Sequence, residues 1–211
     1  MDGLSLSAHL EWKADLTVPA PSSDPDASML ARLAAGEPSA MRAMMDGHGP
    51  RLRRLAARMT GRPEEAEDIV QEAFVAVWRG AVRIHADGAP LGAYLTRVVV
   101  NRCIDRSRRA AFRRLIGLDS APEVDDPAPG ADRTLAARDE VRAVARDLAR
   151  LPVRQRAAIL LAAAGEHSVS EIAVALGLTI GAAEQLLVRA RRTLRQRAME
   201  RAAGGREGEN R

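Results

Sequence analysis

The sequence predicts an all-α protein with two small helical domains joined by a flexible acidic linker, the C-terminal domain containing a helix-turn-helix. Apolar residues recur at three- and four-residue spacing in successive segments, and no segment shows the alternation typical of a strand. This periodicity stops between Gly117 and Asp132, where three prolines and four acidic residues occur. Towards the C-terminus, a short helix, a glycine turn and a long arginine-rich helix follow one another.

The composition is that of a soluble protein that can bury a core. Its 211 residues are enough for two small domains, and 46% are apolar against 28% charged. Aromatic residues make up only 2%, so we expect cores of Ala, Leu, Val and Met. The net charge is +4, and because Lys13 is the single lysine, nearly every basic residue is an arginine, whose planar guanidinium suits phosphate. A GC-rich genome produces the same bias, so the positions of the arginines must decide between the two explanations.

The sequence gives little support to a catalytic, metal-dependent or membrane-inserted protein. Cys103 is the single cysteine, and its apolar neighbours favour a buried side chain over a reactive thiol. No apolar run approaches the ~20 residues of a membrane helix, and the N-terminus lacks the features of a secretory signal. We therefore expect a cytoplasmic protein with no membrane insertion, no catalytic residue, no metal and no cofactor. The histidines lie singly, without the spacing of a helical metal site: His9, His48, His85 and His167.

The N-terminal domain is predicted to span residues 26–114. The preceding residues 1–25 are rich in Pro and Ser and are expected to form a flexible tail. The first helix of the domain begins with Asp26 as its cap and stops at Gly36. A second helix is expected from about residue 38 to residue 60.

The third predicted helix has an apolar face and an acidic face. It opens at Pro63, a first-turn position where proline is tolerated. The outward positions are Asp68, Gln71, Glu72 and Val75. Taken alone, this patch could be a solvated face. An acidic patch on a basic protein repels DNA, however, and is better suited to a basic protein partner.

A loop is expected at residues 83–90, followed by one long helix over residues 91–114. Arginines cover most of the outer side of this helix and cluster towards its C-terminal end. Such a cluster is either a solvated face or a phosphate-binding surface, and the flexible loop before it could hold a base removed from the stack. The arginines are Arg97, Arg102, Arg106, Arg108, Arg109, Arg113 and Arg114.

The acidic linker is placed at residues 115–133, the C-terminal domain at residues 134–200 and a disordered tail at residues 201–211. Helices are expected from residue 134 to residue 150 and from residue 152 to residue 164. Both helix starts are ordinary, and the helices lead into the helix-turn-helix.

The helix-turn-helix is predicted from its caps and its glycine. Ser168 and Glu171 form a capping box, Gly177 closes the short helix, and Thr179 can cap the longer one. A plain helical hairpin would show the same pattern. DNA binding is favoured because five arginines follow in the long helix, where phosphates would lie: Arg189, Arg191, Arg192, Arg195 and Arg197.

Over about residues 26–198, the chain resembles the extracytoplasmic-function sigma factors, the small two-domain subunits that direct bacterial RNA polymerase to promoters. AEDIVQEAFVAVWR is similar to the polymerase-binding helix of that family, and AYLTRVVVNRCIDRSRR to its promoter-melting helix. LARLPVRQRAAILL and SEIAVALGL are similar to its C-terminal DNA-binding domain. Each match is weak alone, and their order along one chain makes the resemblance specific.

The resemblance implies two partners, core RNA polymerase and promoter DNA, and commonly an anti-sigma factor as a third. The polymerase would contact Asp68, Gln71, Glu72 and Val75. The residues implied for the minus-ten element are Arg97, Asn101, Asp105, Arg106 and Arg109. Those implied for the helix-turn-helix contact with the minus-thirty-five element are Thr179, Glu184, Gln185, Arg189 and Arg192.

The recognition helix departs from the family pattern. Ala182, Ala183, Glu184, Gln185 and Leu186 stand where the family usually has residues close to Thr-Val-Lys-Ser-Arg. Glu184 can accept a hydrogen bond from a cytosine edge, and it can equally repel phosphate. Three interpretations therefore stay open: a transcription initiation factor, a sigma-like decoy that binds polymerase or an anti-sigma factor without reading DNA, and a free-standing repressor.

Overall fold

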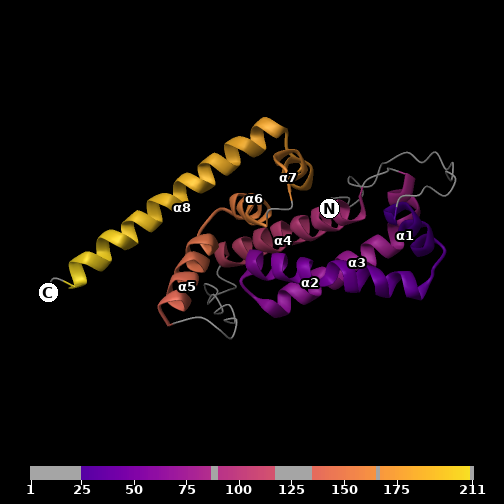
Figure 1. Cartoon of the computed structure of the whole chain (residues 1–211), viewed down its shortest axis with the longest axis horizontal. Coiled ribbons are helices and arrows are strands. Elements are labelled where there is room, and N and C mark those ends of the chain that lie inside the picture. Colours follow the sequence, from indigo (N-terminus) through magenta and orange to yellow (C-terminus); the bar gives the residue numbers. More distant parts are fainter. Residues whose placement is uncertain (1–24, 87–89, 117–134, 165–166, 210–211) are drawn as a thin grey trace.

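The computed structural model describes residues 25–86, 90–116, 135–164 and 167–209. Within these ranges the regular structure is entirely α-helical, which confirms the predicted fold class. The helices, labelled in Figure 1, are α1 (Pro25–Ala34), α2 (Pro38–Thr60), α3 (Pro63–Ala86), α4 (Leu91–Leu115), α5 (Leu135–Ala149), α6 (Val153–Ala163), α7 (Val169–Leu176) and α8 (Ile180–Glu209).

Helices α1 to α4 pack as a bundle around apolar side chains of the predicted kind. Phe74 is the largest fully buried residue, and the leucines, valines, methionines and alanines around it fill the core. Helix α2 ends at Gly61, whose φ of 77° is the left-handed conformation that glycine adopts without strain. This end agrees with the second helix predicted from the sequence, which was expected to stop at about residue 60.

Helix α4 lies at the centre of the molecule. Figure 1 shows α2 and α3 on one side of it and α6 and α7 on the other. Its buried side chains include Leu91, Leu95, Val99 and Ile104. The buried residues of the two halves of the chain form one continuous apolar cluster. Both halves therefore pack on α4.

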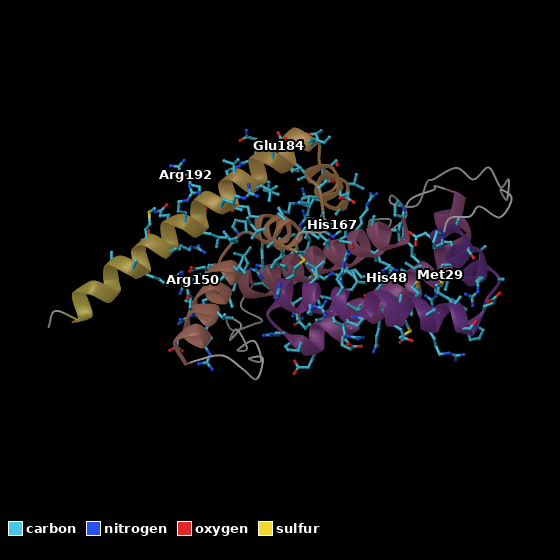
Figure 2. The ribbon with its side chains drawn as sticks, viewed as in Figure 1. Met29, His48, Arg150, His167, Glu184 and Arg192 are labelled. Atoms are coloured by element: carbon cyan, nitrogen blue, oxygen red, sulfur yellow. The ribbon has the colours of Figure 1, made fainter. Side chains whose placement is uncertain are left out.

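Two arginines join the halves by hydrogen bonds. Arg156 of α6 donates from Nη1 to the carbonyl oxygen of Met59 in the last turn of α2, at 2.6 Å. Arg51 of α2 donates from Nη2 to the hydroxyl of Thr96 at 2.8 Å, and the same atom lies 3.0 Å from Nε2 of His167. Figure 2 shows His167 before α7, beside α4.

The helix-turn-helix forms as the sequence predicts. The hydroxyl of Ser168 accepts the backbone N–H of Glu171, and the Glu171 carboxylate accepts the N–H of Ser168, so the capping box is complete. Gly177 then ends α7 at a φ of 61°. Helix α8 starts after Thr179 and extends well beyond α6 and α5 (Figure 1).

The structure corrects the prediction for residues 83–90. Residues 83–86 were predicted as part of a loop, whereas α3 continues to Ala86. Nothing before Gly88 interrupts the helix, and adding a residue to an existing helix needs no new nucleation. Residues 87–89 lie outside the described part of the chain.

The ends of the predicted segments also differ. The C-terminal tail predicted at residues 201–211 is helical as far as Glu209, because Ala202 and Ala203 continue α8 at little cost. Asp26 lies inside α1, and its carboxylate accepts the N–H of Leu91 at 2.8 Å, so it caps α4 instead. Residues 1–24 and 117–134, with most of the predicted linker, lie outside the described residues.

Candidate functional site

The outward face of α3 carries the four residues predicted there. Asp68, Gln71, Glu72 and Val75 are all exposed, with 67% of the Asp68 side chain accessible. Their spacing of three and four residues places them in one stripe along the helix. On the opposite face, Ile69 and its neighbours are buried in the core. The stripe is therefore held on a rigid element and is open to a partner.

This acidic stripe is joined to α4 by ion pairs. Arg102 pairs with Glu72, and Nη2 of Arg106 lies 3.7 Å from Oδ2 of Asp68. Nε of Arg106 also lies 3.6 Å from a carboxylate oxygen of Glu65. All these side chains are partly exposed, so each pair is weak in water. The predicted acidic surface and the predicted DNA-binding surface thus adjoin.

Four of the five residues predicted on α4 share its exposed face. Arg97, Asn101, Asp105 and Arg109 follow one another at four-residue spacing, and all are exposed. Arg106 departs from this group because it turns towards α3. The helices that pack on α4 cover its apolar sides, and they leave this polar stripe exposed.

The exposed face of α8 starts at its cap. Oγ1 of Thr179 accepts the N–H of Ala182 at 3.2 Å, which confirms the predicted cap. Glu184, Gln185, Arg189 and Arg192 are exposed. Figure 2 shows Glu184 near the start of α8 and Arg192 about two turns further along. The residues predicted on this helix therefore lie on an accessible surface.

Burial shifts the pKa values of Cys103 and His48, which lie outside these surfaces. The Cys103 thiol is buried, and desolvation raises its pKa to about 12, despite the opposing effect of Arg106. Burial also lowers the pKa of His48. The negative charge of Asp26 opposes this shift, and the positive charge of Arg51 adds to it. A buried neutral thiol is a poor nucleophile, so Cys103 has the structural character that the sequence predicted.

The described residues hold no cluster of His, Cys, Asp and Glu suited to a metal ion. In that same part of the chain, no single helix is long and apolar enough to cross a membrane.

Sequence reasoning missed two features that depend on long-range packing. Glu65 was not predicted to contact Arg106, although it is one of the two carboxylates that hold Arg106 beside α3. A pocket of about 350 Å³ between α5 and α8 was also missed, and in it Arg197 donates to the carbonyl oxygen of Asp147 at 2.8 Å. No local pattern reveals either feature, because each joins residues far apart in the sequence.

Two regions of the chain match known protein families. Residues 44–113 match the family Sigma-70 region 2, and residues 142–194 match Sigma-70, region 4. The ECF RNA polymerase sigma factor SigM of Mycobacterium tuberculosis is 37% identical over 169 residues, covering 80% of this chain and 82% of SigM.

Two solved structures share the fold. CnrH, solved in complex with the cytosolic domain of CnrY, superposes with a TM-score of 0.59 at 28% identity, covering 85% of this chain and 99% of CnrH. The sigma factor RpoE, in a complex with the anti-sigma factor NepR from Bartonella quintana, gives a TM-score of 0.62 at 23% identity, covering 75% of this chain and 96% of RpoE.

Proposed function

The chain belongs to the extracytoplasmic-function RNA polymerase sigma factors, and from this premise we propose which of its surfaces carry out each step. As a member of the family, it binds core RNA polymerase and directs promoter recognition, promoter melting and transcription initiation. Sigma factors in general are not enzymes. We propose that this chain likewise acts through binding energy alone, without covalent chemistry.

The exposed stripe of α3 is proposed as the polymerase contact. Asp68 and Glu72 give it negative charge, and Val75, with 41% of its surface exposed, adds an apolar contact. A basic protein surface is the complementary partner, and complementary charge speeds association. The ion pairs to Arg102 and Arg106 tie this stripe to α4. Polymerase that competes for these carboxylates would release both arginines for DNA.

The polar stripe of α4 is proposed to hold the minus-ten element. Arg97 and Arg109 supply positive charge for the backbone, and Asn101 lies between them with both donor and acceptor atoms. Asp105 lies 4.0 Å from Arg108, so its charge is partly balanced within the helix. Arg106 would join this surface after leaving Asp68. The observation that supports the assignment is the four-residue spacing of exposed polar side chains on one rigid helix.

The exposed face of α8 is proposed to contact the minus-thirty-five element. Thr179 fixes the start of the helix, and Arg189 and Arg192 follow where phosphates would lie. One observation favours a second candidate function, the sigma-like decoy. Glu184 is exposed near the start of the recognition helix, where its charge repels phosphate.

The proposed division of the chain follows from these surfaces. Residues 26–114 would form the region 2 domain, residues 115–133 the linker and residues 134–200 the region 4 domain. The protein would act in the cytoplasm, because core polymerase and promoter DNA are found there. We also propose an anti-sigma factor as a partner that covers the same surfaces, as NepR and the cytosolic domain of CnrY are found with RpoE and CnrH.

Run-off transcription with purified core polymerase over a promoter library tests the proposed function. A sigma factor yields transcripts from a subset of templates, and only when it is added. A decoy binds core polymerase and yields no transcript. A free-standing repressor binds duplex DNA tightly without polymerase and likewise yields no transcript.

A further inference from the structure

The first two turns of α8 expose a face that is acidic and apolar. With 3.6 residues per turn, the residues of this face recur at three- and four-residue spacing. Ala183, Leu187 and Ala190 are buried on the opposite face and fix the rotation of the helix. The members of this face in the first turns are all accessible, namely Gly181, Glu184, Gln185 and Val188, and Arg192 follows further along the same face.

The cations on this helix begin only after these two turns. Between Ile180 and Val188 the helix contains no arginine or lysine. Arg189 folds back along the helix, where its Nε donates to the carbonyl oxygen of Gln185 at 3.3 Å. Arg192 is therefore the first arginine on the face itself. The N-terminal residues of a recognition helix contact base edges, so Glu184, Gln185 and Val188 are the side chains placed to read them.

The chemistry of these side chains specifies bases. An ionised carboxylate only accepts hydrogen bonds, and the N4 amino group of cytosine is a hydrogen-bond donor in the major groove. A glutamine amide matches adenine N6 and N7 with two hydrogen bonds, and an apolar side chain suits the methyl group of thymine. Val188 is 57% exposed and is therefore accessible for such a contact.

We propose that this face reads the upstream element of the promoter as a sequence that contains a C·G pair, with the cytosine amino group bonded to Glu184. Gln185 reads an adjacent adenine, and Val188 contacts a thymine methyl group one turn further on. The inference rests on the proposed function, because it requires that α8 enters duplex DNA. Glu184, whose charge repels phosphate, is then the source of specificity for cytosine.

The energetic balance favours this arrangement over phosphate contact. Glu184 gains a charge-assisted hydrogen bond from the cytosine amino group, whereas guanine O6 and N7 or thymine O4 would leave its carboxylate desolvated without a donor. Replacing the C·G pair should therefore weaken binding by about tenfold, within the range typical of a single mismatch. The arginines after Val188 supply the attraction to phosphate that the first two turns lack.

A randomised duplex library tests the inference. Holoenzyme reconstituted from core polymerase and the full chain is allowed to select templates in which the upstream element is random and the minus-ten element is fixed. Selection by the natural chain should fix a C·G pair at one position. Glu184→Gln should lose the preference at that position by about tenfold and keep the others, because the amide no longer excludes acceptor bases.

Two further variants make the result specific. Glu184→Lys should replace the selected cytosine by guanine, because an ammonium group donates to guanine O6 and N7. Glu200→Gln is the matched control, since it removes the same charge from an exposed position of α8 four turns away and should select the natural sequence. Circular dichroism should show equal helix content for all variants.

The outcomes of this experiment distinguish a failure of the inference from a failure of the proposed function. If the natural chain drives transcription from selected templates without any preference for cytosine, or if Glu184→Gln keeps that preference, the inference is overturned and the proposed function stands. If no template is transcribed, the proposed function fails and the inference fails with it.

Discussion

Arg156 provides the sharpest test of how the two halves of the chain are joined. Its guanidinium donates to Met59 O at 2.6 Å, to Leu151 O at 3.3 Å and to Ala149 O. Met59 lies in the last turn of α2 and Ala149 is the last residue of α5. Carbonyl groups at these positions have no partner within their own helix, and the negative ends of two helix dipoles meet one positive charge there.

Arg156→Ala removes these three hydrogen bonds together. At about 1 kcal/mol each, the loss in the free energy of unfolding is about 3 kcal/mol, since part of the site can be rehydrated. For a protein of this size, that loss corresponds to a fall of about 6–12 °C in Tm.

Differential scanning calorimetry measures this loss. Arg195→Ala is the matched control, because Arg195 is exposed on α8 and its removal should leave the Tm unchanged. A Tm for Arg156→Ala within about 2 °C of the natural protein would refute the reasoning.

Three smaller predictions follow from the caps and the buried groups. Ser168→Ala should lower the free energy of unfolding by about 1 kcal/mol in urea titrations, because it removes the cap of α7; no change would show that the cap is dispensable. Burial lowers the pKa of His48, so the unfolded chain binds more protons, and stability should fall as the pH decreases below about 6.5. His48→Gln should reduce that slope, and an equal slope would exclude His48 as a cause. Cys103 should react with a thiol reagent at pH 8 only after unfolding, and rapid labelling of the native protein would contradict its burial.

The sequence predicted the helices well where the signal is local. Gly61 and Gly177 end helices because they adopt positive φ, and the capping box of Ser168 and Glu171 depends on residues three positions apart. The exposed stripe of α3 followed from helical spacing for the same reason. Features of this kind are set by neighbouring residues, so a single chain is enough to find them.

Tertiary contacts account for what the sequence did not predict. The periodicity of α4 identified its apolar side, but it did not indicate that helices from both halves would pack there. Arg106 was grouped with the DNA-binding arginines, and only the packing of α3 on α4 places it beside Asp68 and Glu65. Arg156 was part of a family motif in the sequence, and its role as a link between two helix ends depends on residues far away in the chain.

The assignment of α3 as the polymerase contact is tested most directly by removing its charge without reversing it. Because Glu72 pairs with Arg102 and Asp68 with Arg106, reversal would also place like charges together. The double variant Asp68→Asn, Glu72→Gln avoids this repulsion, and Asp139→Asn, Glu140→Gln on α5 is a control with the same change of charge at exposed positions.

The decisive measurement is the affinity of each purified variant for core RNA polymerase at low ionic strength. We expect the α3 variant to bind at least about tenfold more weakly, a loss of about 1.4 kcal/mol, with its Tm almost unchanged because exposed ion pairs contribute little to folding. The α5 control should bind like the natural chain. Equal affinity of the α3 variant and the natural chain would contradict the assignment of α3 as the polymerase contact.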